Sequence, residues 1–199
     1  MTASRGRLPA KERRAGLLET ACRCFSHGTY HGTTTADIAA AAGVTEPVLY
    51  RHFPSKQQLY LACLDEAWLQ ARGIWEHAVE AEPDPAEWLS AMGRAFHGSA
   101  QQKAMLSNLW LQAIADAAGD AELRHYMQRY VRTIHEYVAA VIRRAQERGG
   151  VRTERDPAAE AWLFIATGLL GAVGVRLGGL IDSDLEAIRS ARREWLAGS

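Results

Sequence analysis

The stretch that decides the fold runs over Thr33–Lys56 and reads TTTADIAAAAGVTEPVLYRHFPSK. Thr34 and Asp37 stand at capping-box spacing, in which the two residues satisfy each other's backbone N–H groups, so a helix is expected to begin near Thr35. Gly43 is expected to end this helix, because a residue without a Cβ adopts the left-handed turn conformation at little cost. The first half of the stretch therefore predicts a short helix closed by a tight turn.

The second half of the stretch predicts another short helix. Thr45 is placed to cap it, and Pro47 fits its first turn, where a missing N–H leaves no hydrogen bond unmade. Leu49 and Phe53 are spaced to pack inward, which leaves an outward face of Val48, Tyr50, Arg51 and His52. Two helices joined by a tight turn, with contact-forming side chains outside the second, form the helix-turn-helix arrangement that reads a DNA major groove.

Four runs in this region resemble the N-terminal signature of TetR-family transcriptional regulators. They are Asp37–Ala39, Ala42–Thr45, Leu49–Phe53 and Ser55–Lys56, and the resemblance covers roughly residues 10–61. It implies an all-α fold of about nine helices. A three-helix DNA-binding domain would occupy residues 1–56, and a larger helical domain for effector binding and dimerisation would occupy residues 57–199.

The resemblance also implies which side chains contact DNA. Base edges would be met by Thr45, Pro47 and Val48. Phosphates would be bound by Thr34, Tyr50, His52 and Lys56, whereas Arg51 suits either role and Thr35 and Glu46 complete the contact set. Many family members carry Gly-Thr before the Leu-Tyr pair, but this chain has Pro47-Val48. Val48 offers methyl groups in place of a hydroxyl, so base reading is expected to rely on thymine methyl contacts.

Composition fits a soluble protein of one large domain or two small ones. The chain has 199 residues, 48% of them hydrophobic and 23% charged, and its formal net charge is zero. Residues 1–60 hold eight Lys or Arg against four Asp or Glu, an excess of +4 that residues 61–199 balance. The basic end coincides with the helix-turn-helix, as contact with phosphates requires.

The N-terminal residues and the cysteines indicate where the protein resides. Residues 1–8 are small and basic and are expected to form a disordered arm, and no long apolar run follows them as a secretory signal would require. Cys22, Cys24 and Cys63 are odd in number and lack metal-ligand spacing, which favours a reducing compartment. A cytoplasmic location, no metal site and no cofactor are expected.

The rest of the chain alternates apolar helical periodicity with breaks. Helices are predicted at residues 9–26, 55–80, 86–99, 102–118, 123–145, 156–177 and 183–198. Asp156-Pro157 has the pattern of a cap followed by a first-turn proline, and Ser183 and Glu186 have capping-box spacing. No segment shows the alternation of a strand, so the fold class is all-α.

Large flat side chains in the middle helices suggest a cavity for a small molecule. All six tryptophans lie outside residues 1–60. The predicted ligand-binding residues are Trp68, Trp75, Trp88, Phe96, Met105, Trp110, Met127, Tyr130 and Trp162, with polar anchors among His97, Asn108, Gln112, Asp116 and His135. Such residues also fill ordinary cores. If they do line a cavity, the effector would be largely apolar or aromatic.

The segment from Trp162 to Ile181 is nearly uncharged and rich in glycine. A membrane span is the weaker interpretation, because Arg176 interrupts a short apolar run. Glycines repeated every third residue suit close contact between helices. In the resembling family, the last two helices of each subunit form a four-helix dimer bundle. The predicted dimer residues are Trp162, Gly168, Gly171, Gly174, Leu185, Ile188 and Trp195.

These patterns predict a homodimeric, ligand-responsive transcription regulator, a repressor that binds a palindromic operator. No nucleophile–base, metal-ligand or phosphate-loop pattern is recognisable, so no catalytic residue is assigned. Two alternatives stay open at this point: a helical scaffold that binds peptides through the tryptophan-rich region, and an enzyme.

Overall fold

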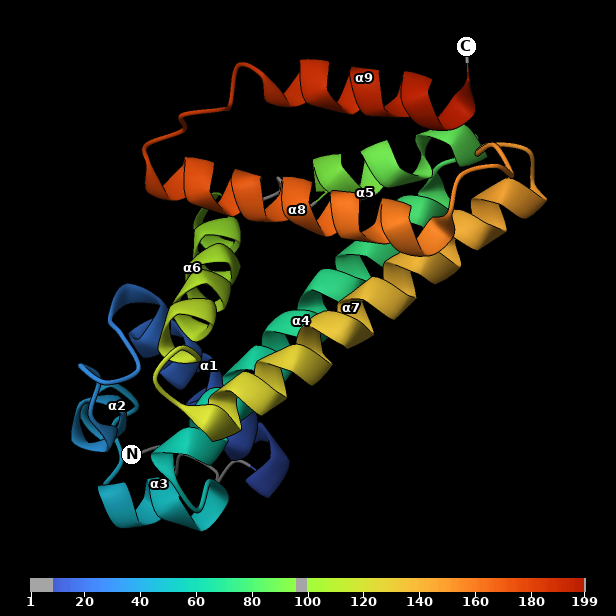
Figure 1. Cartoon of the computed structure of the whole chain (residues 1–199). Coiled ribbons are helices and arrows are strands. Elements are labelled where there is room, and N and C mark those ends of the chain that lie inside the picture. Colours follow the sequence, from blue (N-terminus) through green and yellow to red (C-terminus); the bar gives the residue numbers. More distant parts are fainter. Residues whose placement is uncertain (1–8, 96–99, 199) are drawn as a thin grey trace, which may run out of the picture. The chain divides into compact units, whose positions relative to one another are not determined.

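The computed structural model describes residues 9–95 and 100–198 and is all-α, as predicted. Within those ranges it contains nine α-helices, one 3₁₀ helix and no strand (Figure 1). The predicted arm at residues 1–8 and the predicted ligand residues Phe96 and His97 lie outside the described residues. The contacts divide the chain into two compact units, Met1–Ala67 and Trp68–Ser199. A domain boundary at residue 56 remains a prediction.

The first unit consists of α1 (Ala10–His27), α2 (Thr35–Ala41), α3 (Glu46–His52) and the first part of α4 (Lys56–Ala81). Its core contains the apolar residues that helical spacing predicts: Leu17, Leu18, Ala21, Phe25, Ile38, Leu49, Phe53 and Tyr60, all buried. The Phe25 and Tyr60 rings meet edge to face, with centroids 4.9 Å apart. Edge-to-face contact is a favoured geometry for aromatic pairs, so α1 and α4 are firmly held together.

The second unit consists of the remainder of α4, η1 (Pro85–Glu87), α5 (Trp88–Ala95), α6 (Ala100–Asp116), α7 (Ala121–Glu147), α8 (Pro157–Arg176) and α9 (Leu185–Ala197). Helix α7 packs against α8, and α6 contacts both (Figure 1). The buried stripe of α7 follows the spacing in the sequence and includes Leu123, Met127, Ile134, Val138, Ile142 and Ala145. Its burial between α6 and α8 organises this unit.

Three local predictions differ from the structure. The helix predicted from residue 86 begins at Trp88, because Pro85 opens a 3₁₀ turn that the Asp84 side chain caps. Thr45 is the N-cap residue of α3, but its side chain makes no capping hydrogen bond. The predicted Ser183–Glu186 capping box is wrong.

Helix α9 begins later than the capping-box pattern predicts. Its N-cap residue is Asp184, whose side chain makes no capping hydrogen bond. The preceding backbone is folded into turns, in which the N–H of Asp182 donates to Gly179 and that of Asp184 donates to Ile181, both at 3.0 Å. The N–H of Leu185 donates to Ile181 at 3.1 Å, so the chain enters α9 through backbone turns and without a side-chain cap.

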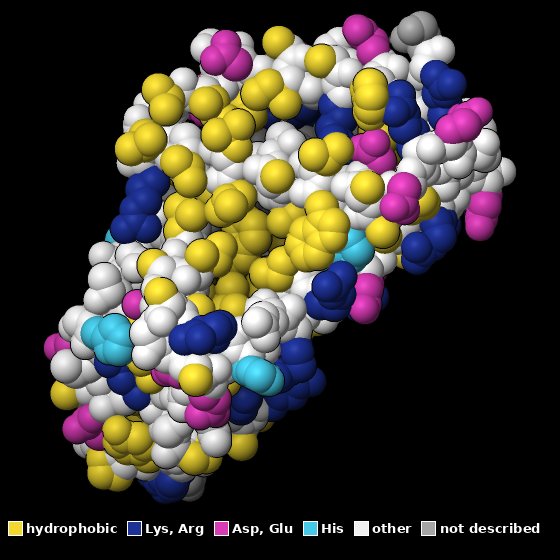
Figure 2. All heavy atoms as spheres, viewed as in Figure 1, with side chains coloured by type: hydrophobic (Ala, Val, Ile, Leu, Met, Phe, Trp, Pro, Cys, Tyr) yellow, Lys and Arg dark blue, Asp and Glu magenta, His cyan; other side chains and the backbone are white. Residues whose placement is uncertain are grey.

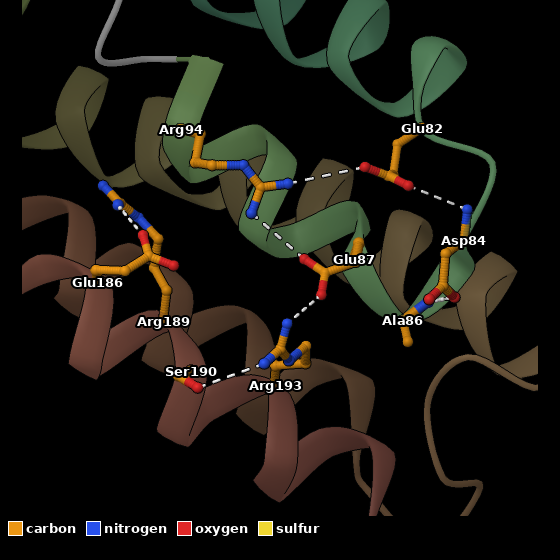
Figure 3. Close-up of polar contacts among 9 residues, drawn as sticks. All are labelled: Glu82, Asp84, Ala86, Glu87, Arg94, Glu186, Arg189, Ser190 and Arg193. Atoms are coloured by element: carbon orange, nitrogen blue, oxygen red, sulfur yellow. Dashed lines mark hydrogen bonds and ion pairs between the residues drawn. The ribbon is translucent and has the colours of Figure 1, made fainter.

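Charged side chains join α9 to α5 and η1 (Figure 3). The Glu87 carboxylate accepts hydrogen bonds from Arg94, at 3.3 Å, and from Arg193 of α9. Arg94 also lies 3.7 Å from Glu82, so one arginine bridges two carboxylates. Arg193, together with Arg94, holds the pKa of the Glu87 carboxyl below its usual range. Glu87 therefore links η1 to α5 and to the last helix. We call the ion pairs of Glu87 with Arg94 and Arg193 the Glu87 brace.

The lowered pKa of Glu87 gives a pH-dependent prediction. The brace contributes stability at pH values above the ordinary glutamate pKa of about 4.3 and loses it as the pH falls through the lower pKa of the folded state. Glu87→Gln should therefore be less stable than the wild type at pH 7, and the difference should shrink by pH 3. Urea unfolding followed by circular dichroism checks this. Exposed Glu147→Gln is the control, and an equal difference at both pH values would contradict the assignment.

Candidate nucleic-acid interface and ligand region

The start of α2 is fixed by the predicted capping box. The Thr34 hydroxyl accepts from the Asp37 N–H at 3.1 Å and donates to the Asp37 carboxylate at 2.6 Å, while the Thr34 N–H donates to the same carboxylate at 3.0 Å. These hydrogen bonds from Thr34 lower the pKa of Asp37. The Thr34 side chain, predicted to bind phosphate, is thus already engaged in holding the helix end that would approach DNA.

The turn between α2 and α3 depends on Gly43, whose φ of +66° lies in the left-handed region. The Gly43 N–H donates to Ala40 at 3.1 Å, and the next N–H, of Val44, donates to Ala39 at 3.0 Å. This is the glycine-terminated helix end that the sequence predicts. This turn fixes the direction of α3 relative to α2.

Helix α3 separates an inner face from an outer one. Leu49 is fully buried. Phe53, the C-cap residue of α3, is also buried in the core. The remaining predicted contact residues are accessible to different degrees: Thr45, Pro47, Tyr50 and Arg51 are exposed, and Val48 and His52 are half-buried. The helix therefore presents the outward face that groove reading needs.

A hydrogen-bonded triad links the outer face of α3 to α2. The Thr35 hydroxyl donates to the Glu46 carboxylate at 2.5 Å and lies 3.1 Å from the Tyr50 hydroxyl. One hydroxyl of α2 therefore restrains two side chains that stand one turn apart on α3. Because their rotamers are held before any partner binds, less conformational entropy is lost on binding.

Basic side chains of the same unit stack on aromatic rings. Lys56, the first residue of α4, has its Nζ 4.7 Å from the centroid of the Tyr30 ring. The Ser55 hydroxyl accepts from the Gln58 N–H at 3.0 Å and caps α4. The guanidinium of Arg14 lies 4.6 Å from the Phe53 ring centroid. Lys56 thus stands at a helix N-terminus, where the helix dipole and its own charge both favour a phosphate.

In the second unit, four aromatic rings form a cluster, which we call the aromatic cluster. It joins two predicted ligand residues of α4, Trp68 and Trp75, to Tyr137 of α7 and Phe164 of α8. Centroids are 5.9 Å apart for Trp68–Trp75, 5.6 Å for Trp68–Tyr137, 6.1 Å for Trp75–Tyr137 and 5.5 Å for Trp75–Phe164. All four side chains are half-buried. Sequence reasoning missed Tyr137 and Phe164, although Tyr137 follows the predicted Tyr130 by one heptad.

The other predicted ligand residues occupy different surroundings. Trp88 is buried, and its indole N–H donates to the carbonyl of Glu82 at 3.0 Å, so it is a core residue. Met127 is buried in the same unit, whereas Met105, Trp110 and Tyr130 are half-buried. Trp162 is exposed, and its ring lies against that of His135 at an interplanar angle of 31°, with centroids 4.4 Å apart. Among the predicted ligand residues that the structure describes, Trp68 and Trp75 alone belong to the aromatic cluster.

Three polar atoms of α6 and α7 are buried without a hydrogen-bond partner among the described residues. The buried His135 pairs its Nε2 with the carbonyl of Ala158 at 2.9 Å, and its Nδ1 has no hydrogen-bond partner among the described residues. The same holds for Trp110 Nε1 and Asp116 Oδ2. Burying such groups unpaired costs free energy, so each is a candidate for an interaction with a bound molecule. Figure 2 shows a hollow lined by hydrophobic side chains beside α6, α7 and α8.

One cation already lies near the aromatic cluster. The Arg72 guanidinium is 6.0 Å from the centroid of the Tyr137 ring and donates to Glu76 at 2.7 Å. Burial raises the pKa of the Tyr137 hydroxyl, with Glu76 adding to the effect. In the described ranges, no group of three His, Cys, Asp or Glu residues is arranged to hold a metal ion.

The helix-turn-helix formed by α2 and α3, together with the all-α second unit, defines a helix-turn-helix transcription regulator. Residues 17–63 match the family description "Bacterial regulatory proteins, tetR family", and residues 85–192 match "BetI-type transcriptional repressor, C-terminal". The second match alone spans more than half of the chain. The chain belongs to the TetR family.

Individual relatives agree with this assignment. The chain is 52% identical over 58 residues to the transcriptional activator FasR of Mycolicibacterium smegmatis, a match that covers 29% of this chain and only 26% of FasR. A TetR-family regulator from Rhodococcus sp. has the same fold, with a TM-score of 0.84, 20% identity and coverage of 94% of this chain and 99% of that one. A regulator from Saccharomonospora viridis, solved in complex with choline, has a TM-score of 0.74 at 23% identity, covering 91% and 93%.

Proposed function

We propose that the chain is a cytoplasmic, homodimeric transcription regulator that releases its operator when a small molecule binds. The helix-turn-helix carries this proposal, since α3 buries Leu49 and keeps Tyr50 and Arg51 exposed. A match to the C-terminal region of BetI-type repressors supports repression as the mode of action. A dimer of such units would read a palindromic operator with half-sites about one helical turn or somewhat more apart.

In this proposal phosphate contacts set the register and base contacts set the sequence. Lys56 and His52 bind phosphates together with Tyr50, while Thr45, Pro47 and Val48 face the bases. Thr34 contributes through the helix end that it caps, because its hydroxyl is paired with Asp37.

Glu46 is proposed to read a base. A carboxylate repels phosphates but accepts a hydrogen bond from the exocyclic amine of cytosine in the major groove. Glu46 stands in the first turn of α3, and the Thr35 hydroxyl holds its Oε1. The other carboxylate oxygen is left for the cytosine.

The reading role of Glu46 is tested by selecting bound DNA from a random pool. The wild type should enrich an inverted repeat with one cytosine position per half-site that depends on Glu46. Glu46→Gln should lose the preference at that position by roughly tenfold, corresponding to about 1–3 kcal/mol of discrimination, and keep the others. Glu66→Gln, on α4, is the control. An unchanged cytosine preference would refute the role of Glu46, and failure to enrich any repeat would refute operator binding.

Lys56 is expected to act through charge alone. Lys56→Ala should weaken binding to all sequences by a similar factor and lower the slope of log affinity against log salt by about one. Filter binding at several salt concentrations measures both. Arg129→Ala, which removes an exposed charge from α7, should change neither quantity. A loss confined to one sequence would show that Lys56 reads bases.

We propose that the effector is largely apolar or aromatic and binds at the aromatic cluster. Half-buried tryptophan faces stack on flat ligands, and Trp110 Nε1 or His135 Nδ1 would supply a polar anchor. Trp68 and Trp75 belong to α4, the helix that begins at Lys56. A ligand that moves these rings would therefore act directly on a helix that also carries a DNA-contacting residue.

A cationic effector is the second candidate, supported by the choline complex of the S. viridis protein. Aromatic rings bind quaternary ammonium groups when they surround the cation. The rings of this cluster contact one another, and Arg72 already lies over Tyr137. This arrangement favours stacking over enclosure, and therefore the flat ligand.

The two other classes have simple tests. A peptide-binding scaffold would not shift the DNA upstream of its own gene in a gel. An enzyme would convert a bound small molecule on incubation, whereas a regulator returns it unchanged.

A further inference from the structure

Helix α7 carries a buried histidine whose hydrogen-bonding capacity is only half used. His135 is 6% exposed, and its Nε2 lies 2.9 Å from the carbonyl oxygen of Ala158, in the first turn of α8. Its Nδ1 is buried and has no hydrogen-bond partner among the described residues. A buried polar atom without a partner costs free energy, so a molecule that supplies the missing partner binds more tightly than one that does not.

The pairing with Ala158 determines which kind of partner Nδ1 can take. A carbonyl oxygen only accepts hydrogen bonds, so Nε2 carries the hydrogen and donates it. In a neutral imidazole the other ring nitrogen then carries no hydrogen and acts as an acceptor. The missing partner of His135 is therefore a hydrogen-bond donor, such as a hydroxyl or an N–H group.

The surroundings disfavour an imidazolium, in which Nδ1 would donate instead. None of the ion pairs in the described ranges involves His135, so a positive charge on this ring would be buried without a carboxylate. The guanidinium of Arg132 lies 5.3 Å from the centroid of the Trp162 ring, which itself lies against His135. Two positive charges on one aromatic side chain would repel each other. The surroundings therefore favour the acceptor form of His135 and an uncharged donor on its partner.

Trp162 of α8 covers this histidine and is free to move. Its ring lies against the imidazole, with centroids 4.4 Å apart, and its side chain is 41% exposed. Exposed side chains change rotamer on picosecond to nanosecond timescales. Trp162 can therefore turn aside and give a small molecule access to His135 without unpacking the core.

His135 and Trp162 lie at the level of the aromatic cluster. Tyr137 and Phe164 of the cluster follow them by two positions in α7 and α8, about 3 Å along each helix axis. Residues two positions apart do not share a helix face, so a ligand would contact the cluster and His135 with different parts. Figure 2 shows the apolar hollow beside α6, α7 and α8 from which such a ligand would enter.

We propose that the effector carries an uncharged hydrogen-bond donor at one end of a flat apolar body, and that Nδ1 of His135 accepts from it. The inference rests on the proposed effector site and specifies its polar end. An aromatic hydroxyl is the simplest donor of this kind, so the ligand class is that of hydroxylated aromatic compounds. His135 determines specificity, because a compound without the donor leaves the buried acceptor unpaired. Trp162, predicted for both the ligand region and the dimer contact, belongs here to the ligand region.

The donor requirement is tested by isothermal titration calorimetry with naphthalenes that differ in one substituent. 1-Naphthol carries the donor, 1-methoxynaphthalene lacks it, and 1-naphthoate carries a negative charge. The wild type should bind 1-naphthol roughly tenfold more tightly than 1-methoxynaphthalene, in line with the cost of an unpaired buried acceptor. It should bind 1-naphthoate no more tightly than 1-methoxynaphthalene.

Matched variants assign this preference to Nδ1. His135→Gln retains an amide nitrogen near the position of Nε2 but no acceptor at Nδ1, and should reduce the preference to less than about twofold. His135→Asn places its amide oxygen near the position of Nδ1 and should keep most of the preference. His125→Gln, at an exposed histidine of α7, is the control and should keep all of it. Circular dichroism establishes that each variant is folded, and His135→Phe replaces His135→Gln if the latter is not.

Equal affinities of the wild type for 1-naphthol and 1-methoxynaphthalene would overturn the inference, and so would a full preference in His135→Gln. Loss of the preference in His135→Asn as well would show that His135 only supports the site. Tightest binding of 1-naphthoate, lost in His135→Gln, would show an imidazolium that binds anions and would also overturn the inference. If the wild type bound none of the three compounds, the proposed effector site itself would be refuted.

Discussion

One continuous helix, α4, contributes buried apolar side chains to the cores of both compact units. Leu59, Tyr60 and Cys63 are buried in the first unit, and Val79 in the second. Its 26 residues correspond to about 39 Å at 1.5 Å per residue. An unbroken ladder of backbone hydrogen bonds resists bending, so a displacement imposed on one part of the helix is not easily absorbed inside it. The proposed release of operator DNA on effector binding depends on this stiffness.

The second constraint is electrostatic and concerns α9. Glu160 is only 4% exposed, and a buried carboxylate is costly unless its oxygens are paired. Here Arg192 and Trp195, both from α9, donate to it. Removing Arg192 would leave the Glu160 charge unpaired in the interior, and removing Trp195 would leave one carboxylate oxygen without its donor, which makes the α8–α9 arrangement specific. Together with the Glu87 brace, this pairing fixes the last helix from two sides.

Local chemistry explains what could be predicted from the sequence. The Thr34–Asp37 box, the Gly43 turn and the Asp156 cap each involve groups a few residues apart, so their patterns predicted the correct elements. The Ser183 pattern failed because backbone turns carry the chain on to Asp184, which becomes the N-cap residue of α9. Contacts between distant helices leave no such local pattern, and Tyr137 and Phe164 were therefore missed.

The α8 helix shows the same limit on a larger scale. Its glycines attract attention in the sequence because they are unusual in a helix, whereas leucines at heptad spacing are common. Which side is covered depends on where α6 and α7 pack. Only that packing distinguishes an internal contact, such as Gly174 against Ile181, from a position that stays exposed.

The central claim is that the aromatic cluster and the DNA-binding unit are energetically coupled. It is tested by titrating tryptophan fluorescence with 1-naphthol, with choline in parallel, in the absence and presence of saturating operator DNA. Reciprocity requires that operator DNA weaken naphthol binding by the same factor by which naphthol weakens operator binding, and we expect a factor of about 5–150. Equal naphthol affinity with and without operator DNA, or saturable binding of choline alone, would contradict the account.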